Sequence, residues 1–534
     1  MVRLTFYGGV NEIGGNKILL EDAGNTLFLD FGFSYKRHKM FFEEYLNPRG
    51  AAGLLDPLTM GLIPPIEGLY REDLQEPQLW HDFRNKPLYR TIGEIDGILL
   101  SHAHLDHSGH ISLIRGDIPV YSTATTAFLV KAIQDSGKSG LEQQICYYNP
   151  DKYDIPTGWR QPSFTSDRSQ PSLQRQFRLG DSDPSLLSNE SIDFWSSGFW
   201  EKSARQKQMN SRSLEKANLS GFNLKCFPVD HSIPGACAWA IETNSGWIIY
   251  SGDLRLHGKR PHLTRNFIEQ ARNLEPDALI IEGTNAGRDK NVSEQDIYEN
   301  GTRAISDAKH LVIADFSPRD IDRLLTFLLI AEEHDRKLAI LPKDAYLLKT
   351  LGLVDPNIPN INKNDYLYLY QKTTGASDLW VRNLMTDYES KTVLADEVNA
   401  AQDEFILCFS FFDLNELPSI HPVEGSLYVY SSSEPHDEEQ EIDFRRLHEW
   451  LRYFDFRSVG LPEEKDGKWE IPENETGLHA SGHASGTDLL DIVREIHPKK
   501  LIPVHSEQPE FFVENLSDIG IEVILPSPGG SIHL

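Results

Sequence analysis

The chain has 534 residues, of which 39% are hydrophobic and 25% charged, and its formal net charge is −28. This length exceeds one ordinary hydrophobic core, so we expect at least two domains in a soluble globular protein. No apolar run approaches the ~20 residues that span a bilayer, which argues against a membrane protein.

The start of the chain and its cysteines both predict a cytoplasmic protein. Residues 1–9 read as a strand, and no basic segment leads into an apolar one, so we expect no secretory signal. Cys146, Cys226, Cys237 and Cys408 form no CxxC pair. We therefore expect reduced cysteines that pack like small hydrophobic residues.

Short β-rich runs recur along the chain, and a histidine or carboxylate stands at or just past the end of each. They cover residues 26–30, 97–102, 247–253, 278–282 and 501–505. Helical patterns lie between them, one beginning with Ser317 as N-cap and Pro318 at the first helical position, and another after residue 486. Alternating strands and helices predict an α/β fold, in which ligands gather at strand ends.

The motif His102-Ala103-His104-Leu105-Asp106-His107 follows the second of these strands directly. Imidazole and carboxylate groups suit zinc. One turn cannot direct all four side chains at a single ion without crowding, so we predict two adjacent ions. His102 and His104 would bind one, and Asp106 and His107 the other. Burying these groups together without metal would be costly.

Three further residues are predicted to complete the two ions. His231 can supply a third imidazole to the first ion, His505 can complete the second, and Asp253 can bridge both. A single histidine is more often structural than a ligand, but the position of all three after strands agrees with a shared site. Coordination would remain open for a hydroxide and a substrate oxygen.

The order of these residues resembles the metallo-β-lactamase superfamily. Further motifs are similar to those of the β-CASP nucleases, and especially of the ribonuclease J family. Residues 8–16 resemble the first hairpin of that family, Glu282 its acidic motif A, His483 its motif B and His505 its motif C. The resemblance runs from residue 3 to the end of the chain.

The resemblance implies an α/β fold: a metallo-β-lactamase αββα sandwich with an inserted α/β β-CASP domain. The sandwich would comprise residues 1–285 and 479–534, and the inserted domain residues 286–478. Residues 36–90 and 150–220 depart from the family pattern and are expected to be insertions. A separate C-terminal domain, as in ribonuclease J, is not expected. The oligomeric state of this chain therefore stays open, with a homodimer as one alternative.

The resemblance also implies roles for residues beyond the metal ligands. His483 is the expected general acid, and Glu282 would hold its tautomer. Asp106 counts among the catalytic residues as well as the ligands. Asp30 would orient a ligating histidine, although a turn residue at a strand end is the alternative.

The candidate substrate contacts are backbone amides and polar side chains near two helix starts, where phosphate groups bind well. They are Ser481, Gly482, Ala484 and Ser485 before one helix, and Ser317 and Arg319 before another. A simple glycine-rich helix start or a helix cap explains the same residues.

Together these features predict a zinc-dependent ribonuclease that cuts single-stranded RNA as a 5′–3′ exonuclease, an endonuclease or both. Two Zn²⁺ ions, or Mn²⁺ in their place, would generate the attacking hydroxide. A histidine at motif C resembles the RNA-directed members of the family. The alternatives are a DNA nuclease of the same family, a small-molecule hydrolase acting on thioesters or lactones, and a non-catalytic subunit.

The net charge conflicts with a nucleic-acid substrate, because phosphate contacts usually come from Lys and Arg. Two basic runs follow predicted site residues: 36–39 after Asp30, and 255–260 after Asp253. We predict that both line the rim of one cleft and make its mouth positive. Ordinary solvated loops are the alternative.

Overall fold

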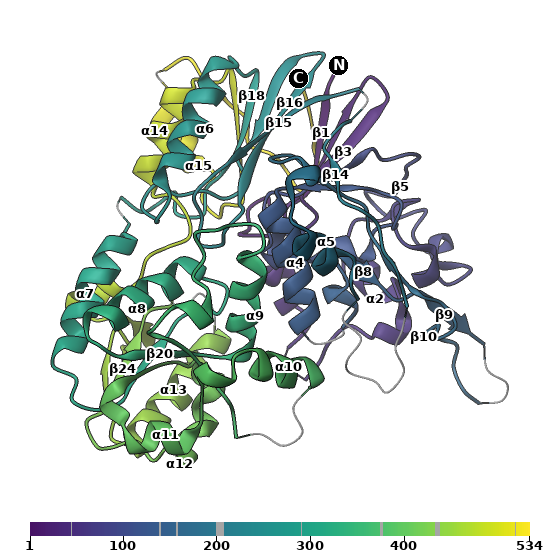
Figure 1. The fold of residues 1–534 in the computed structure, drawn as a ribbon. Helices are drawn as coiled ribbons and strands as arrows, with labels where there is room; N and C mark the ends of the chain where they lie inside the picture. Colours follow the sequence, from purple (N-terminus) through teal and green to yellow (C-terminus); the bar gives the residue numbers. More distant parts are fainter. Residues whose placement is uncertain are drawn as a thin grey trace.

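The computed structural model describes residues 1–43, 45–137, 140–155, 159–198, 208–219, 221–289, 291–373, 378–432, 438–517 and 519–534. Three large β-sheets with helices on their outer faces make up the α/β fold (Figure 1). The first two sheets form a sandwich, and the third belongs to a separate layered unit.

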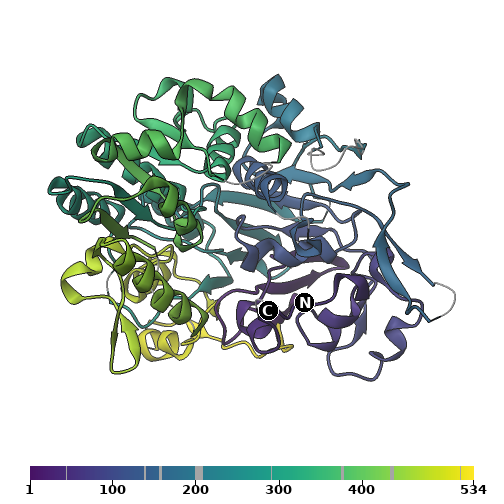
Figure 2. The same ribbon diagram turned by 90° about the horizontal axis from the view of Figure 1, so that it is seen from below.

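The first sheet has eight strands. They are β1 (Arg3–Gly8), β2 (Lys17–Asp22), β3 (Asn25–Leu29), β6 (Gly97–Leu99), β7 (Val120–Ser122), β12 (Phe177–Leu179), β14 (Glu215–Lys216) and β30 (Ser531–His533). Their order is β14-β12-β7-β6-β3-β2-β1-β30. Because β30 pairs with β1, the two ends of the chain lie side by side, as both views show (Figures 1 and 2).

The second sheet has six strands. They are β15 (Asn223–Pro228), β16 (Cys237–Thr243), β17 (Gly246–Tyr250), β18 (Ala278–Glu282), β28 (Lys500–Val504) and β29 (Glu522–Val523), in that spatial order. The central strands β17, β18 and β28 run parallel. The neighbours β18 and β28 are separated by more than 200 residues in the sequence, so the chain leaves this sheet and later returns to it.

Alternating side chains join the two sheets into the sandwich. Leu27 and Leu29 of β3 pack in the core between the sheets, together with Ile502 and Val504 of β28. Phe28 points to the opposite face, as the two-residue period of a strand requires. Helices cover the outer faces: α4 (Ala124–Ser136) on the first sheet, and α6 (Pro261–Asn273), α14 (Gly486–Ile496) and α15 (Glu510–Leu516) on the second.

The third sheet is wholly parallel and is formed between β18 and β28 in the chain. Its strands are β19 (Val312–Asp315), β20 (Lys337–Ile340), β21 (Leu367–Tyr370), β22 (Thr392–Val393), β23 (Phe405–Cys408), β24 (Leu427–Tyr430) and β25 (Arg457–Val459). Their order is β22-β21-β20-β23-β19-β24-β25. A parallel sheet needs helices on both faces.

Those helices lie on the two faces of the third sheet, which we call the inserted sheet. One face carries α7 (Glu294–Ser306), α8 (Ile321–Glu333), α9 (Pro342–Leu351) and α10 (Leu379–Asp387). The other carries α11 (Ala395–Ala400), α12 (Leu417–Ile420) and α13 (Glu438–Tyr453). The first face shares one continuous apolar cluster with the sandwich, where α4 packs against α9.

The two segments predicted to be insertions fold in different ways. The first forms α1 (Tyr35–Lys39), α2 (Leu55–Thr59), β4 (Ile66–Glu67) and β5 (Arg90–Thr91), and buries Leu54 and Leu58 against the sandwich. The second includes β12 and β14, two strands of the first sheet. Only part of it, such as the hairpin of β9 (Asp151–Asp154) and β10 (Ser163–Ser166), extends outward (Figure 1). Residues 156–158, 199–207 and 220 of that segment lie outside the described residues.

The predicted strands all form, but one predicted helix start is wrong. Helix α8 begins at Ile321, and its N-cap is Asp320, whose side chain accepts a hydrogen bond from the Arg323 amide at 3.0 Å. Ser317 and Pro318 lie in the preceding turn. The carboxylate at position 320 competes successfully with the serine for the cap.

No helix in the described parts of the chain is both long enough and apolar enough to cross a membrane.

Candidate metal centre

Strand ends deliver most of the predicted site residues to one place. His102 follows β6, Asp253 follows β17, and His505 follows β28. Glu282 is the last residue of β18. His102, Asp253, Glu282 and His505 are all essentially buried. Because these strands belong to the facing sheets, their ends meet at one edge of the sandwich.

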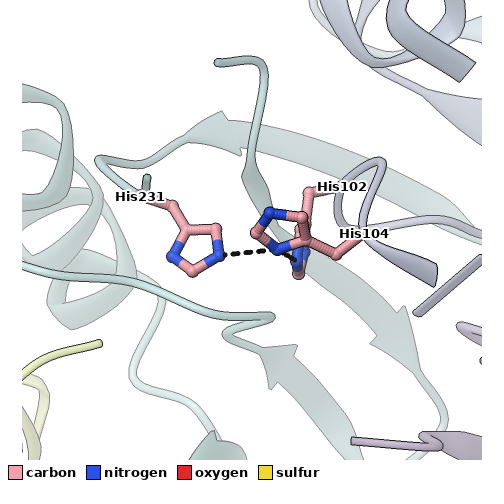
Figure 3. Close-up of side chains that lie close together, drawn as sticks. All are labelled: His102, His104 and His231. Carbon is pink, nitrogen blue, oxygen red and sulfur yellow. Dashed lines mark hydrogen bonds between the residues drawn. The ribbon is translucent and has the colours of Figure 1, made fainter. Parts of the chain in front are cut away.

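His102, His104 and His231 form the first group of potential ligands (Figure 3). Nε2 of His102 lies 3.0 Å from Nδ1 of His104, and Nε2 of His231 lies 3.1 Å from that same atom. Three imidazole nitrogens therefore converge on one point, as a zinc site requires.

Asp106, His107, Asp253 and His505 form the second group. Nε2 of His505 lies 3.2 Å from Oδ2 of Asp106, and Nε2 of His107 lies 3.0 Å from Oδ2 of Asp253. That Asp253 oxygen is also 3.6 Å from Nε2 of His102 in the first group. Asp253 thus lies between the two groups, where the sequence predicts a bridging carboxylate.

The second nitrogen of each of three buried histidines is held by a partner outside the centre. Nδ1 of His107 donates to Asp30 at 2.6 Å, and Nδ1 of His231 donates to the Gly482 carbonyl at 2.5 Å. Nδ1 of His505 lies 2.8 Å from the Thr284 hydroxyl. Such partners fix the tautomer and leave Nε2 directed at the centre, an arrangement typical of metal-ligating histidines.

Burial and charge set the ionisation of the centre. Burial lowers the pKa of His104 to about 4, and it also lowers the pKa values of His102 and His231 well below the usual range. Burial would lower the pKa of His107 too, but the carboxylates of Asp253, Asp106 and Asp30 outweigh it and raise that pKa. Neutral imidazole beside carboxylate is the donor set of a divalent metal.

Two buried atoms at the centre test whether a metal fits. Within the described residues, Nε2 of His107 and Oδ1 of Asp253 are buried without a hydrogen-bond partner. A buried polar atom without a partner is costly, and the great majority in folded proteins are satisfied. Both atoms belong to residues of the second ligand group, and a metal ion is the partner that this donor set fits.

His483 and Glu282 lie beside the second group. Nδ1 of His483 is 3.1 Å from both carboxylate oxygens of Glu282, and its ring lies 5.5 Å from that of His505. Burial would lower the pKa of His483, but Glu282 and Asp253 raise it to about 9. The same side chain also belongs to a third potential ligand group with Asp253, Glu282 and His505.

In the loop before α14, several groups predicted to bind phosphate already have partners within the protein, and phosphate binding by this loop stays a prediction. The amide of Ala484 donates to the Leu254 carbonyl at 2.8 Å, so it is already engaged within the protein. Ser485 is the N-cap of α14, with its hydroxyl on the Asp488 amide. Ser481 accepts from the Asn285 side chain at 2.9 Å, and the Gly482 carbonyl faces His231. These hydrogen bonds hold the loop in place within the protein.

Ser317 and Arg319 lie in the turn between β19 and α8. Ser317 is exposed and Arg319 is half-buried. The positive charge of Arg319 is close enough to lower the pKa of His104. A phosphate contact by these two residues stays a prediction.

The prediction that both basic runs line one positive cleft is wrong for Arg255 in the second run. Arg255 has no exposed surface and pairs with Asp230 and Asp322, and Arg260 pairs with the same Asp322. In the first run, Lys36 pairs with Glu507 and Arg37 with Glu12. Their charges are compensated within the protein, because a buried or half-buried cation needs a carboxylate partner.

Sequence reasoning missed the residues that support the ligands. Ser101 donates to Asp30 through both its amide and its hydroxyl, and Tyr250 donates to the same carboxylate at 2.6 Å. Thr284 and Asn285 hold His505 and the His483 loop. Ser101 and Thr284 stand next to motif residues and were detectable for that reason, whereas Tyr250 reaches the site only through the fold.

The amino-acid sequence of this chain is similar to those of known ribonuclease J proteins. Ribonuclease J of Mycolicibacterium smegmatis is 22% identical over 513 residues, covering 94% of this chain and 68% of that protein. Ribonuclease J of Helicobacter pylori is 20% identical over 513 residues, covering 95% of this chain and 56% of its own length. The chain thus spans roughly half to two thirds of these relatives. The chain is similar to ribonuclease J over most of its length, and its α/β fold agrees with the expected metallo-β-lactamase fold.

A family model matches one part of the chain, and a solved structure has a similar fold. Residues 472–526 match the model of the Zn-dependent metallo-hydrolase RNA specificity domain. That stretch contains both His483 and His505. A crystal structure of a protein of unknown function from Enterococcus faecalis V583 aligns over 100% of both chains, with a TM-score of 0.63 and 21% identity. The fold class expected from the sequence is thereby confirmed.

Proposed function

We propose that this protein hydrolyses phosphodiester bonds of single-stranded RNA with two metal ions. The observation that carries the proposal is the paired ligand groups with Asp253 between them, directly beside the Glu282–His483 pair. The matched RNA specificity domain and the ribonuclease J relatives support RNA as the substrate. The division into residues 1–285, 286–478 and 479–534 remains part of the proposal.

The ligands for the first ion would be His102, His104 and His231, and those for the second Asp106, His107 and His505, with Asp253 shared. Two zinc or manganese ions bound there would activate water near neutral pH and offset charge on the phosphate. The protein's own contribution is to orient the imidazoles, through Asp30, Gly482 and Thr284.

His483 is the residue proposed to give a proton to the leaving oxygen. Its Nδ1 faces Glu282, which leaves Nε2 for exchange with the substrate. The ring lies 5.2 Å from that of His231 and 5.5 Å from that of His505, so it stands over both ligand groups. A proton donor placed against the leaving group contributes roughly 10²–10⁴-fold to the rate.

The decisive experiment measures cleavage of 5′-labelled and 3′-labelled RNA, and of the matched DNA, by wild type and His483→Ala, with a metal count on each. We expect two metals in both proteins, RNA cleavage by wild type, and a loss of about 10²–10⁴-fold in the variant. The positions of the labelled products separate exonuclease from endonuclease activity.

The same experiment separates the other readings. Loss of one metal in His483→Ala would show that His483 is a ligand in the third group, and not the proton donor. Cleavage of DNA in preference to RNA would make the protein a DNA nuclease. Bound metal with no cleavage of either polymer would favour a small-molecule hydrolase, which the net charge of −28 and the compensated basic runs suit better.

A further inference from the structure

Arg255 connects three separate segments behind the candidate metal centre. Its guanidinium has no exposed surface. Nε lies 3.4 Å from Oδ1 of Asp230, Nη1 donates to the Ser481 carbonyl at 3.2 Å, and Nη2 donates to Oδ2 of Asp322 at 2.7 Å. Asp230 precedes the ligand His231, Ser481 lies in the loop that carries His483, and Asp322 belongs to helix α8 of the inserted sheet.

The loop of residues 480–483 is held through its backbone. Four consecutive carbonyl oxygens each accept a hydrogen bond from a side chain. Arg323 donates to Ala480 at 3.4 Å, Arg255 and His257 to Ser481, His231 to Gly482, and Asn285 and Asn291 to His483. A loop without regular structure therefore has a fixed path, and the position of His483 follows from these donors.

Helix α8 supplies the charges that keep Arg255 in place. Asp322 is buried and accepts from Arg255 through one oxygen and from Arg260 through the other, at 2.7 and 3.0 Å. The next residue, Arg323, pairs with the buried Glu294 of α7. A buried guanidinium must be paired, so removing Asp322 would leave Arg255 with an incomplete set of acceptors.

We propose that Arg255 is a positioning residue for His483, and that Asp322 fixes Arg255, so that docking of helix α8 sets the geometry of the proton donor. The proposal rests on the proposed function, in which His483 protonates the leaving oxygen. A displacement of the donor by about 1 Å is enough to cost roughly 10²-fold in rate. The inserted sheet thus contributes to catalysis without contacting the reacting atoms.

The test compares Arg255→Met, Arg255→Lys and Asp322→Leu with wild type on RNA and on bis(4-nitrophenyl) phosphate, with a metal count. The nitrophenolate leaves readily without a proton, so this ester does not depend on His483. We expect Arg255→Met to lower kcat on RNA about 100-fold, with KM within about threefold and metal content unchanged. The loss on the activated ester should be at least about tenfold smaller, and Arg255→Lys should recover part of kcat.

A matched control and a double variant test the mechanism further. Arg336, also buried, donates to backbone carbonyls of His310 and Ala308 within the inserted unit and has no described bond to the site. Arg336→Met should keep the ratio of the two activities at the wild-type value. Because Arg255 and Asp322 act through one hydrogen bond, Arg255→Met combined with Asp322→Leu should lose no more kcat than Arg255→Met alone.

Amide hydrogen exchange, measured by mass spectrometry, reports how firmly the loop is held and does not depend on activity. We expect faster exchange in residues 480–486 of Arg255→Met than of wild type, and no change there in Arg336→Met. Unchanged loop exchange, or equal losses on both esters, would overturn the proposal. If wild type cleaves the activated ester but not RNA, the proposed function fails, while altered exchange in Arg255→Met would still support positioning of the loop.

Discussion

Asp30 lies beneath the candidate metal centre with no exposed surface, and its carboxylate accepts hydrogen bonds from three side chains and one amide. They come from the Ser101 amide and hydroxyl, Nδ1 of His107 and the Tyr250 hydroxyl. Its backbone is in the left-handed region at φ 53°, which turns the chain sharply at the end of β3. A small acidic side chain tolerates this conformation better than most.

At the residue scale we predict that Asp30→Asn weakens metal binding about 10- to 100-fold. The neutral amide of asparagine accepts the hydrogen bond from Nδ1 of His107 more weakly than the charged carboxylate does. Competition with a chromophoric chelator measures this directly. Tyr250→Phe removes a single donor and should have a smaller effect. Equal zinc affinity in Asp30→Asn and wild type would contradict a role for Asp30 in orienting the ligand.

The sequence was most informative for residues whose chemistry is visible locally. The HxHxDH motif, Asp253 and His505 could be assigned to two groups because a histidine or carboxylate after a strand has few other reasons to be there. The role of Arg255 could not be predicted in this way. An arginine in a basic run resembles any exposed cation, and only the packing of α8 shows that its charge is buried and paired.

At the scale of elements, helix α9 carries a buried carboxylate in its first turn. One oxygen of Asp344 accepts from the Leu341 amide at 3.1 Å, and the other is buried without a described hydrogen bond. Burial, together with the nearby Asp413, raises the pKa of Asp344 to about 7. The folded state thus favours the protonated form, whereas the unfolded chain ionises near pH 4.

The sign of the resulting pH dependence follows from that shift. Because the folded pKa is the higher one, this stabilisation is complete below about pH 4 and is lost as pH rises through 7. We predict that Asp344→Asn raises the thermal midpoint at pH 8 relative to wild type, with little change at pH 5. Scanning fluorimetry across this range measures it, and a difference that does not grow with pH would contradict the shift.

Element order was predictable from the sequence, but one element boundary and one insertion were not. Apolar runs that end in polar residues marked β3, β6, β17, β18 and β28 well. The start of α8 depended on which of two capping side chains reaches a free amide, and this is decided by geometry. The polar composition of residues 150–220 hid β12 and β14, since strands of two or three residues contain few apolar positions.

At the scale of the whole molecule, a buried ion pair lies where α4 of the sandwich packs against α9, a helix on the inserted sheet. Lys131 and Asp135 of α4 are 2.7 Å apart and almost wholly buried, and the Tyr346 hydroxyl of α9 donates to Asp135 at 3.1 Å. We predict that Lys131→Met lowers the free energy of unfolding by about 3–5 kcal/mol, because it leaves a buried carboxylate without its cation.

Chemical denaturation measures this loss, and a double variant is its control. Lys131→Met with Asp135→Leu removes both charges and should be more stable than Lys131→Met alone. A double variant that is no more stable than the single one would show that the charges themselves do not matter at this junction.

The parallel neighbours β18 and β28 have a consequence for the timing of synthesis. The potential ligands extend from His102 to His505, so ~400 residues must be translated between the first and the last, on the order of 20–80 s at 5–20 residues per second. Throughout that time the nascent chain lacks His505, and for most of it His483 as well. In the proposed function, a growing copy of this protein therefore cannot cut the message from which it is being read, and cleavage begins only after the last sandwich strands join.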